Sequence, residues 1–274
     1  FIPFNKQKSG AVLEKVTQLD FLESKGETSR ISVQSRKRGC IYGLFIGDAL
    51  AMPVHWYYDR QAMQRDYGWV TDYLSPKNPH PDSILWRSFY EPVNEKGEIL
   101  HDQAKYWGRR GVHYHQFLKV GENTLNLKLC LKLMESLNEK GGYDADDYLQ
   151  RYISFMTRPG NHSDTYVEEY HRHFFTKFAQ GVPPKKCGIH EKHIGGLVGV
   201  IPIVVFYMED AKKAKNAALQ HLSLTHLGTT MEEATSTLVD LLLRILNGNS
   251  LKDVLMAEVS SQRSPFARYP FVKW

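Results

Sequence analysis

The sequence predicts an all-α fold with an irregular, loop-rich insertion around residues 56–120. Two observations lead to this prediction: apolar residues recur with helical periodicity in successive segments, and capping and stop residues separate those segments. In addition, no strand–helix–strand alternation and no fixed-period repeat is present. With 274 residues, of which 42% are hydrophobic, the chain suits a globular protein rather than a disordered or coiled-coil one.

The N-terminal part divides into a loosely ordered arm and a glycine-marked helix. Residues 1–33 have weak periodicity, with one helix expected around residues 12–23. From residue 36 to Pro53 a helix is expected in which Gly39, Gly43 and Gly47 share one face. An interior glycine costs about 1 kcal/mol relative to alanine, so three in register predict the close approach of another backbone or of a ligand.

Residues 56–120 are rich in proline and contain four of the five tryptophans, which predicts loops with one or two short strands, such as the alternating stretch 69–74. The leucine-rich segment 124–137 fits both periods, and its length and its Leu, Lys and Glu content favour a helix.

Five or six further helical segments follow, each with a cap or stop residue. We expect Asp144 to cap a helix over residues 148–156, and Ser163 or Asp164 to cap one over residues 167–178. A glycine-rich helix is expected over 194–208 and an alanine-rich helix over 211–222. Thr230 and Glu233 form a predicted capping box for residues 238–245, and Ser250 with Asp253 is expected to open the last helix.

Composition also excludes several classes of partner. The net charge of +5 is spread along the chain, which argues against binding of nucleic acid or of an anionic membrane. The longest apolar run, 197–208, contains Pro202 and is too short to cross a bilayer. Cys40, Cys130 and Cys187 lie far apart, without metal-type spacing, so we expect a reducing compartment and a cytoplasmic protein.

Two stretches carry oxygen-bearing side chains at helix ends. Asp48 lies near the C-terminus of an apolar helix, where a carboxylate is electrostatically misplaced and requires a cation or several donors. The simpler alternative is a carboxylate that faces solvent or a neighbouring backbone. Glu122, Asn123 and Thr124 begin the leucine helix, and such ligands suit Mg²⁺ or Ca²⁺, although Asn or Thr there is also an ordinary N-cap.

Two further stretches could contact a ligand. Gly195 and Gly196 begin an apolar helix, where glycines can let the phosphates of a nucleotide approach backbone N–H groups, although tight helix packing explains them equally simply. Thr225 and His226 lie between two helices.

In their order and separation, these stretches resemble the ADP-ribosylglycohydrolase family, over about residues 36–274. The resemblance rests on the glycines and Gly47-Asp48-Ala49-Leu50 of the first helix, Gly121 to Thr124, Gly195-Gly196 through Pro202, and Thr225-His226. Further motifs resemble the branch that contains the J-type lens crystallins, namely residues 49–59, His113-Tyr-His115, residues 121–126 and Asp164-Thr-Tyr-x-Glu-Glu-Tyr-His-Arg172.

The resemblance implies a single-domain orthogonal helical bundle over residues 34–274 with a two-magnesium cleft. The implied activity is Mg²⁺-assisted hydrolysis of an N- or O-glycosidic bond to ADP-ribose, in a small molecule or an ADP-ribosylated protein. Glu122, Asn123 and Thr124 would hold the metal, Asp48 and His55 would border the reacting bond, and Gly195, Gly196, Thr225 and His226 would contact the substrate.

Three departures from the family pattern bear on this activity. Glu122-Asn123 replaces an Asp-Asp pair, so one anionic ligand is lost, and His55 stands where relatives commonly have Glu. An Asp-x-Asp-Thr motif expected after Thr225-His226 is absent up to Trp274, and we expect the chain to be a fragment lacking its C-terminal part. The alternative to a hydrolase is a catalytically inactive, crystallin-like structural or ligand-binding relative.

Overall fold

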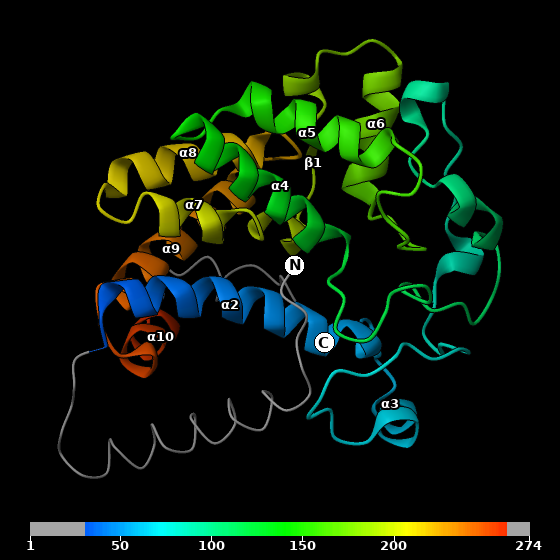
Figure 1. The fold of residues 1–274 in the computed structure, drawn as a ribbon, viewed down its shortest axis with the longest axis horizontal. Coiled ribbons are helices and arrows are strands. Elements are labelled where there is room, and N and C mark those ends of the chain that lie inside the picture. Colours follow the sequence, from blue (N-terminus) through cyan, green and yellow to red (C-terminus); the bar gives the residue numbers. More distant parts are fainter. Residues whose placement is uncertain (1–30, 262–274) are drawn as a thin grey trace.

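A computed structural model describes residues 31–261, and these residues form helices joined by loops, with one pair of two-residue strands (Figure 1). The all-α prediction is confirmed. Residues 1–30 of the predicted arm, including the helix expected around residues 12–23, lie outside the described residues. The α-helices are α2 (Val33–Ala51), α3 (Arg60–Tyr67), α4 (Leu125–Lys140), α5 (Ala145–Thr157), α6 (Glu169–Ala179), α7 (Val200–Phe206), α8 (Ala211–Ser223), α9 (Thr229–Leu246) and α10 (Leu251–Val259).

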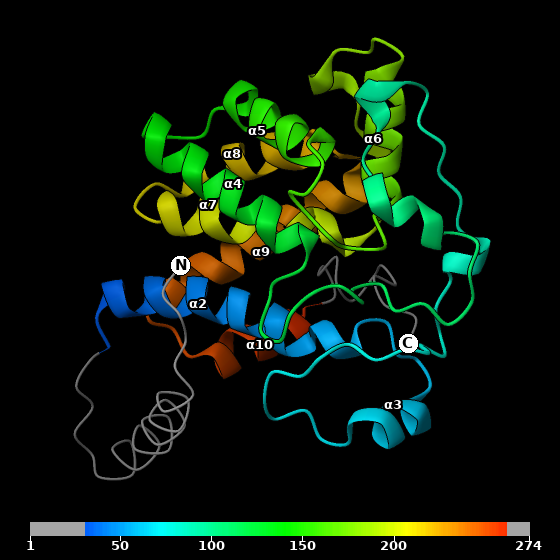
Figure 2. The same cartoon turned by 45° about the vertical axis from the view of Figure 1, so that its right-hand side comes forward.

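The hydrophobic core lies between α4, α5, α6, α7, α8 and α9. It is built from leucines of α4, aromatic residues of α5 and α6 and small residues of α8, among them Leu133, Tyr152, Phe174 and Ala218. Helix α2 packs on α7 and α9 along one side of this group, and α10 packs on α9 (Figure 2). Among the described residues, no helix is long and apolar enough to cross a membrane.

The insertion between α2 and α4 differs from its prediction. No strand forms over residues 69–74, and the Trp69 side chain is 88% exposed, so the alternation there has no neighbouring strand or core to pack on. Instead the insertion contains α3, which begins where the Asp59 carboxylate accepts from the N–H groups of Gln61 and Ala62, and ends at Gly68. Four short 3₁₀ turns complete it: η1 (Met52–Val54), η2 (Leu85–Arg87), η3 (Glu95–Gly97) and η4 (His101–Tyr106).

Several helix boundaries follow the caps read from the sequence, and two do not. Asp144 caps α5 and Ser250 caps α10 as predicted. Neither Ser163 nor Asp164 caps α6, because that helix begins after Glu168. Thr230 does not cap α9 either, since the helix begins one residue earlier, after Gly228, whose φ of 114° favours glycine.

The glycine-rich helix expected over residues 194–208 is interrupted. A 3₁₀ turn, η6 (Ile194–Leu197), precedes α7, which starts after Gly199. Pro202 lies in the first turn of α7, where its missing N–H removes no helical hydrogen bond. The other 3₁₀ turn of this region is η5 (Pro184–Lys186).

One short parallel ladder joins two distant segments. Strand β1 (Ile189–His190) pairs with β2 (His226–Leu227), with Ile189 opposite His226 and His190 opposite Leu227. The pairing places the segment that leads into η6 beside Thr225 and His226. Two stretches for which the sequence predicts ligand contacts are therefore neighbours in space.

The glycine face of α2 does not behave as expected. Gly39, Gly43 and Gly47 are exposed, and a Cβ added at any of them meets no described atom within 4 Å. Among the residues that the structure describes, no other backbone approaches this face, and the approach of a ligand stays a prediction. Helix α2 contributes Ala49, which is buried, and Cys40, which packs against the core.

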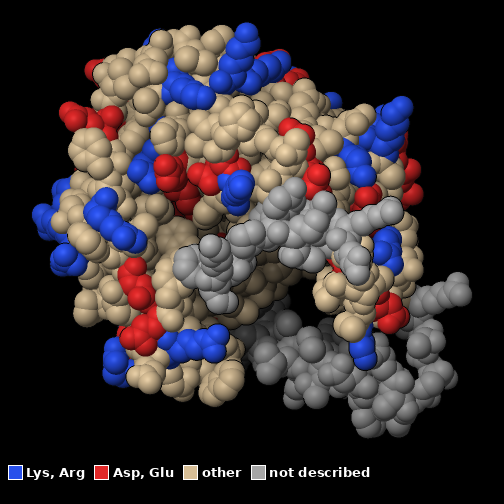
Figure 3. All heavy atoms as spheres, turned by 180° about the vertical axis from the view of Figure 1, so that it is seen from behind, with Lys and Arg blue, Asp and Glu red and all other residues tan. Residues whose placement is uncertain are grey.

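The surface charge matches the composition. On the face opposite to that of Figure 1, basic and acidic side chains are interspersed (Figure 3).

Candidate active site

The central cavity of the described chain lies where the C-terminal end of α2 meets the N-terminal end of α4. Its volume is about 220 Å³. Side chains from five segments line it: Asp48, His55, Trp56, His115, Thr124, Leu125, Asn126, Leu127, Asp164, Tyr166, Glu168, His193, Ile194, Gly195 and Val198. Four of the residues predicted from the sequence as site residues thus line one cavity: Asp48, His55, Thr124 and Gly195.

Asp48 is held by hydrogen-bond donors from the start of α4. Its Oδ2 accepts from the backbone N–H of Thr124 (2.8 Å) and from Nδ2 of Asn123 (2.9 Å), and its Oδ1 accepts from the Thr124 hydroxyl (2.7 Å). The carboxylate therefore caps α4 from another helix, where the helix dipole favours a negative charge. The sequence left a cation or several donors open as the requirement of Asp48, and in the structure donors meet it.

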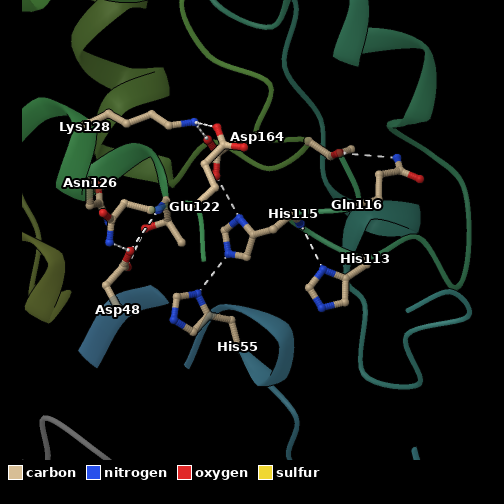
Figure 4. Close-up of polar contacts among 12 residues, drawn as sticks. Asp48, His55, His113, His115, Gln116, Glu122, Asn126, Lys128 and Asp164 are labelled. Atoms are coloured by element: carbon tan, nitrogen blue, oxygen red, sulfur yellow. Dashed lines mark hydrogen bonds and ion pairs between the residues drawn. The ribbon is translucent and has the colours of Figure 1, made fainter. Parts of the chain in front are cut away.

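The other predicted metal ligands are engaged in ways that do not suit a cation. Asn123 turns the nitrogen of its amide toward Asp48 and also donates to the carbonyl of Phe45 (2.7 Å). Glu122 forms an ion pair with Nζ of Lys128 at 2.8 Å (Figure 4).

A Mg²⁺ ion needs several free oxygen ligands in octahedral geometry. Of the three predicted ligands, Asn123 offers an N–H group, Thr124 uses its hydroxyl as a donor, and Glu122 is paired with a lysine. Within residues 31–261 no cluster of three His, Cys, Asp or Glu side chains could hold a metal ion. The residues present therefore do not fit the magnesium site that the resemblance implies.

A chain of three side chains ends at the cavity. Asp164 Oδ1 lies 2.8 Å from Nδ1 of His115, and Nε2 of His115 lies 2.9 Å from Nδ1 of His55 (Figure 4). Because a carboxylate only accepts, Nδ1 of His115 carries the hydrogen. With neutral rings, Nε2 of His115 then accepts from Nδ1 of His55. Nε2 of His55 keeps a lone pair and makes no hydrogen bond to a described residue.

Burial and charge set the protonation states of this chain. Burial lowers the pKa of His55 to about 3, helped by the neighbouring imidazoles of His115 and His113, so His55 is neutral at neutral pH. Asp164 is fully buried, and burial acts to raise its pKa. The hydrogen bond from His115 and the charge of Lys128, whose Nζ lies 3.8 Å from Oδ2, outweigh burial and hold the pKa of Asp164 below its usual value.

Two further histidines fix the loop that presents His55. Nε2 of His80 donates to the carbonyl of His55 (2.9 Å), and Nε2 of His113 donates to the carbonyl of Pro53 (3.0 Å). In each ring Nδ1 accepts a backbone N–H, from Asp82 and His115 respectively. Both rings are therefore neutral with the hydrogen on Nε2, and their hydrogen bonds fix the backbone on either side of His55.

Glu168, immediately before α6, places a second titratable group in the cavity. Its side chain is 12% exposed, and burial raises the pKa of its carboxyl group. Asn126 Nδ2 donates to Oε1 of Glu168 at 2.9 Å, while Asn126 Oδ1 accepts from the hydroxyl of Tyr170 and from His171. A buried network thus holds Glu168 in one orientation.

The predicted substrate-contacting residues divide between two places. Gly195 lines both the central cavity and a smaller adjoining cavity of about 40 Å³, and Gly196 and Thr225 line the smaller one. His226 is fully buried, with Nδ1 hydrogen-bonded to the Thr225 hydroxyl (2.8 Å). A Cβ on Gly196 would lie 2.6 Å from the His226 ring, so the close packing that the sequence left open as the role of these glycines holds for Gly196.

The sequence reasoning missed three residues as carriers of chemistry: His115, Asp164 and Glu168. All three lie in the motifs His113-Tyr-His115 and Asp164-Thr-Tyr-x-Glu-Glu-Tyr-His-Arg172, which were used only to recognise a branch. A signal was present, because a histidine pair and an acidic motif in loop segments indicate more than packing. Their partners could not be read from spacing, since 49 residues separate His115 from Asp164.

The family model described as ADP-ribosylglycohydrolase matches residues 29–269, which is most of the chain. No curated protein matches the sequence.

Proposed function

The chain belongs to the ADP-ribosylglycohydrolase family, and we propose that it hydrolyses an N- or O-glycosidic bond to ADP-ribose with an acid and a base of its own. The observation that carries the proposal is the meeting of two different titratable systems in one cavity: the Asp164–His115–His55 chain and the buried Glu168. Hydrolysis of a glycosidic bond needs such a pair, one group to activate water and one to protonate the leaving atom.

His55 is the proposed base. Its neutral ring has a lone pair on Nε2 that no described residue engages, and this nitrogen takes a proton from water as the oxygen attacks the anomeric carbon. Because burial lowers the pKa of the resting ring to about 3, the transfer depends on the carboxylate of Asp164, whose charge acts to raise that pKa. The positive charge formed on His55 is stabilised through His115 by Asp164, as the buried carboxylate of a catalytic triad stabilises an imidazolium. Lys128, between Glu122 and Asp164, keeps that carboxylate ionised.

Glu168 is the proposed acid. Burial raises its pKa, so a larger fraction of the carboxyl group holds a proton near neutral pH than in water. That proton passes to the nitrogen or oxygen that leaves the anomeric carbon, and the water hydroxyl becomes the new anomeric substituent. The proton on His55 then returns to Glu168 through solvent, which restores both groups.

The substrate would lie between aromatic and glycine surfaces. Trp56, Tyr166 and Gly195 are among the residues that line the cavity. No step of the proposed reaction passes through Mg²⁺, because the donors around Asp48 and the Glu122–Lys128 pair do not fit that ion. Asp48 is instead a positioning residue that joins α2 to α4.

An inactive, crystallin-like relative would need the fold and no reactive groups. The resemblance of several motifs to the J-type lens crystallin branch keeps this alternative as one outcome of the test.

Free Cys40, Cys130 and Cys187 agree with the reducing, cytoplasmic setting that we propose.

The test is release of ADP-ribose from N-linked and O-linked ADP-ribosyl substrates, followed for the parent protein and for His55→Gln. We expect turnover by the parent protein and a loss of about 10²- to 10⁴-fold in the variant, the usual contribution of a general base. His190→Gln is the matched control, because His190 is exposed on β1 and is not among the residues that line either cavity. Binding of ADP-ribose without turnover of any substrate would favour the inactive relative.

A further inference from the structure

A second cavity, of about 250 Å³, adjoins the central one. The two share Trp56, Tyr166, Glu168 and His193 as a common wall. The remaining lining residues are Tyr58, Ile84, Tyr114, Glu169, Tyr170 and Glu191. A ligand whose scissile bond lies in the central cavity can therefore extend into this one.

The lining is aromatic and acidic. Five of its ten residues are tyrosine or tryptophan, three are glutamate, and no lysine or arginine is among the described residues that line it. Carboxylates repel a pyrophosphate, so the diphosphate of ADP-ribose is disfavoured here. Aromatic faces beside carboxylates attract organic cations instead.

The aromatic walls are held in fixed orientations. Trp56 has a φ of 58°, a left-handed conformation that is costly for a tryptophan, and its ring packs edge to face on Tyr114 (4.5 Å) and Tyr166 (5.2 Å). The Tyr114 hydroxyl accepts from the N–H of Ile84 and donates to the carbonyl of Asp82. Such walls are formed before a ligand arrives.

Each carboxylate of the cavity has one oxygen engaged within the protein. Glu191 Oε1 accepts from the backbone N–H groups of Lys192 and His193, Glu168 Oε1 accepts from Asn126, and Glu169 Oε1 lies 3.2 Å from Nε2 of His173. A guanidinium binds best to both oxygens of one carboxylate. None of the three offers both, which favours a cation that acts as a point charge.

We propose that this cavity binds an alkylammonium group, a quaternary or protonated amine, of a ligand that also reaches the central cavity. Tyr58 and Trp56 would supply the aromatic faces, and Glu191 and Glu169 the negative charge. The extension to the central cavity rests on the proposed function, because there the ligand's glycosidic bond would be cleaved. Binding of the cation itself does not rest on it.

The experiment compares three probes by titration calorimetry with the full chain. Choline carries a trimethylammonium group, and 3,3-dimethyl-1-butanol has the same shape without the charge. Methylguanidine carries its positive charge on a planar guanidinium group. We expect choline to bind at least tenfold more tightly than the uncharged isostere and more tightly than methylguanidine. Equal binding of choline and its isostere overturns the proposal.

Variants locate the binding. Glu191→Gln and Tyr58→Ala should each weaken choline binding at least threefold, and Tyr58, which is 47% exposed, can be shortened without opening the core. Glu232→Gln, on the exposed side of α9, is the matched control and should leave choline binding unchanged. Unchanged choline binding in Tyr58→Ala contradicts the site. Choline binding without any hydrolysis would contradict only the proposed function, and hydrolysis without choline binding only this inference.

Discussion

Replacing Asp164 by Asn reverses the hydrogen-bond chain that ends at His55. In the parent protein Lys128 Nζ lies 3.8 Å from Oδ2 of Asp164, while Oδ1 accepts from His115. In Asp164→Asn the ammonium of Lys128 favours the amide oxygen on its own side. The amide NH₂ group then faces His115 and donates to its Nδ1.

This reversal changes the tautomers of His115 and His55. With Nδ1 of His115 accepting, the hydrogen of that ring moves to Nε2 and is donated to Nδ1 of His55. The hydrogen of His55 then sits on Nε2, so no lone pair is left there to take a proton from water. The comparable loss of the correct tautomer in a serine protease triad lowers kcat about 10⁴-fold, and we expect a loss of about 10³- to 10⁴-fold here.

The stability cost should be much smaller than the loss of activity. A hydrogen bond to a charged group contributes about 1.5–3 kcal/mol, and removal of a buried charge offsets part of that loss. We therefore expect the free energy of unfolding to fall by about 1–3 kcal/mol. Asp144→Asn is the matched control, because the Asp144 carboxylate caps α5 by accepting from two backbone N–H groups and is not among the residues that line the cavity.

The assays are steady-state release of ADP-ribose and imidazole ¹⁵N NMR of the same samples. Nδ1-protonated and Nε2-protonated histidines give separate nitrogen shifts, so the tautomers of His55 and His115 can be read directly. Activity of Asp164→Asn within threefold of the parent protein, or unchanged tautomers, would show that Asp164 does not act through these two rings.

Three further outcomes are expected. Glu168→Gln should keep the fold and the hydrogen bond from Asn126 but lower kcat about 10²- to 10⁴-fold. In the parent protein the acid form of Glu168 is needed and burial raises its pKa, so kcat should fall as pH rises through that pKa, and the Gln variant should lack this alkaline limb. Asn123→Asp should place two carboxylates in contact and lower the Tm, and millimolar Mg²⁺ should restore the Tm of this variant but leave that of the parent protein unchanged. A Tm of the variant that does not respond to Mg²⁺ would contradict this expectation. Gly196→Ala should lower the free energy of unfolding by about 1–3 kcal/mol through overpacking on His226. Gly43→Ala, whose added Cβ meets no described atom within 4 Å, should raise it by up to about 1 kcal/mol, and chemical denaturation of both variants checks the opposite signs.

The sequence predicted best the features that depend on neighbouring residues. Asp144 and Ser250 cap the helices that follow them, because a cap is decided by the side chain and the next three N–H groups. Asp164 shows the limit of that reasoning. It has the residue type of a cap and stands before a helix, yet its carboxylate is engaged by His115, which lies 49 residues earlier.

The candidate site was predictable in its location and not in its chemistry. Asp48, His55, Thr124 and Gly195 do line one cavity. Side-chain direction decides the rest: Glu122 turns to Lys128, Asn123 presents its nitrogen, and His226 is buried beside Gly196. Spacing along the chain cannot distinguish an asparagine that offers an oxygen from one that offers an N–H group, because that choice depends on the partner across the cavity.

The proposal that this family member works with its own acid and base is tested most directly by one comparison of rates. ADP-ribose release is measured after exhaustive treatment with EDTA and again after Mg²⁺ is added in excess. We predict the same kcat in both samples, because Asp48 is satisfied by donors from Asn123 and Thr124. A kcat that is lost in EDTA and returns only with Mg²⁺ would contradict it.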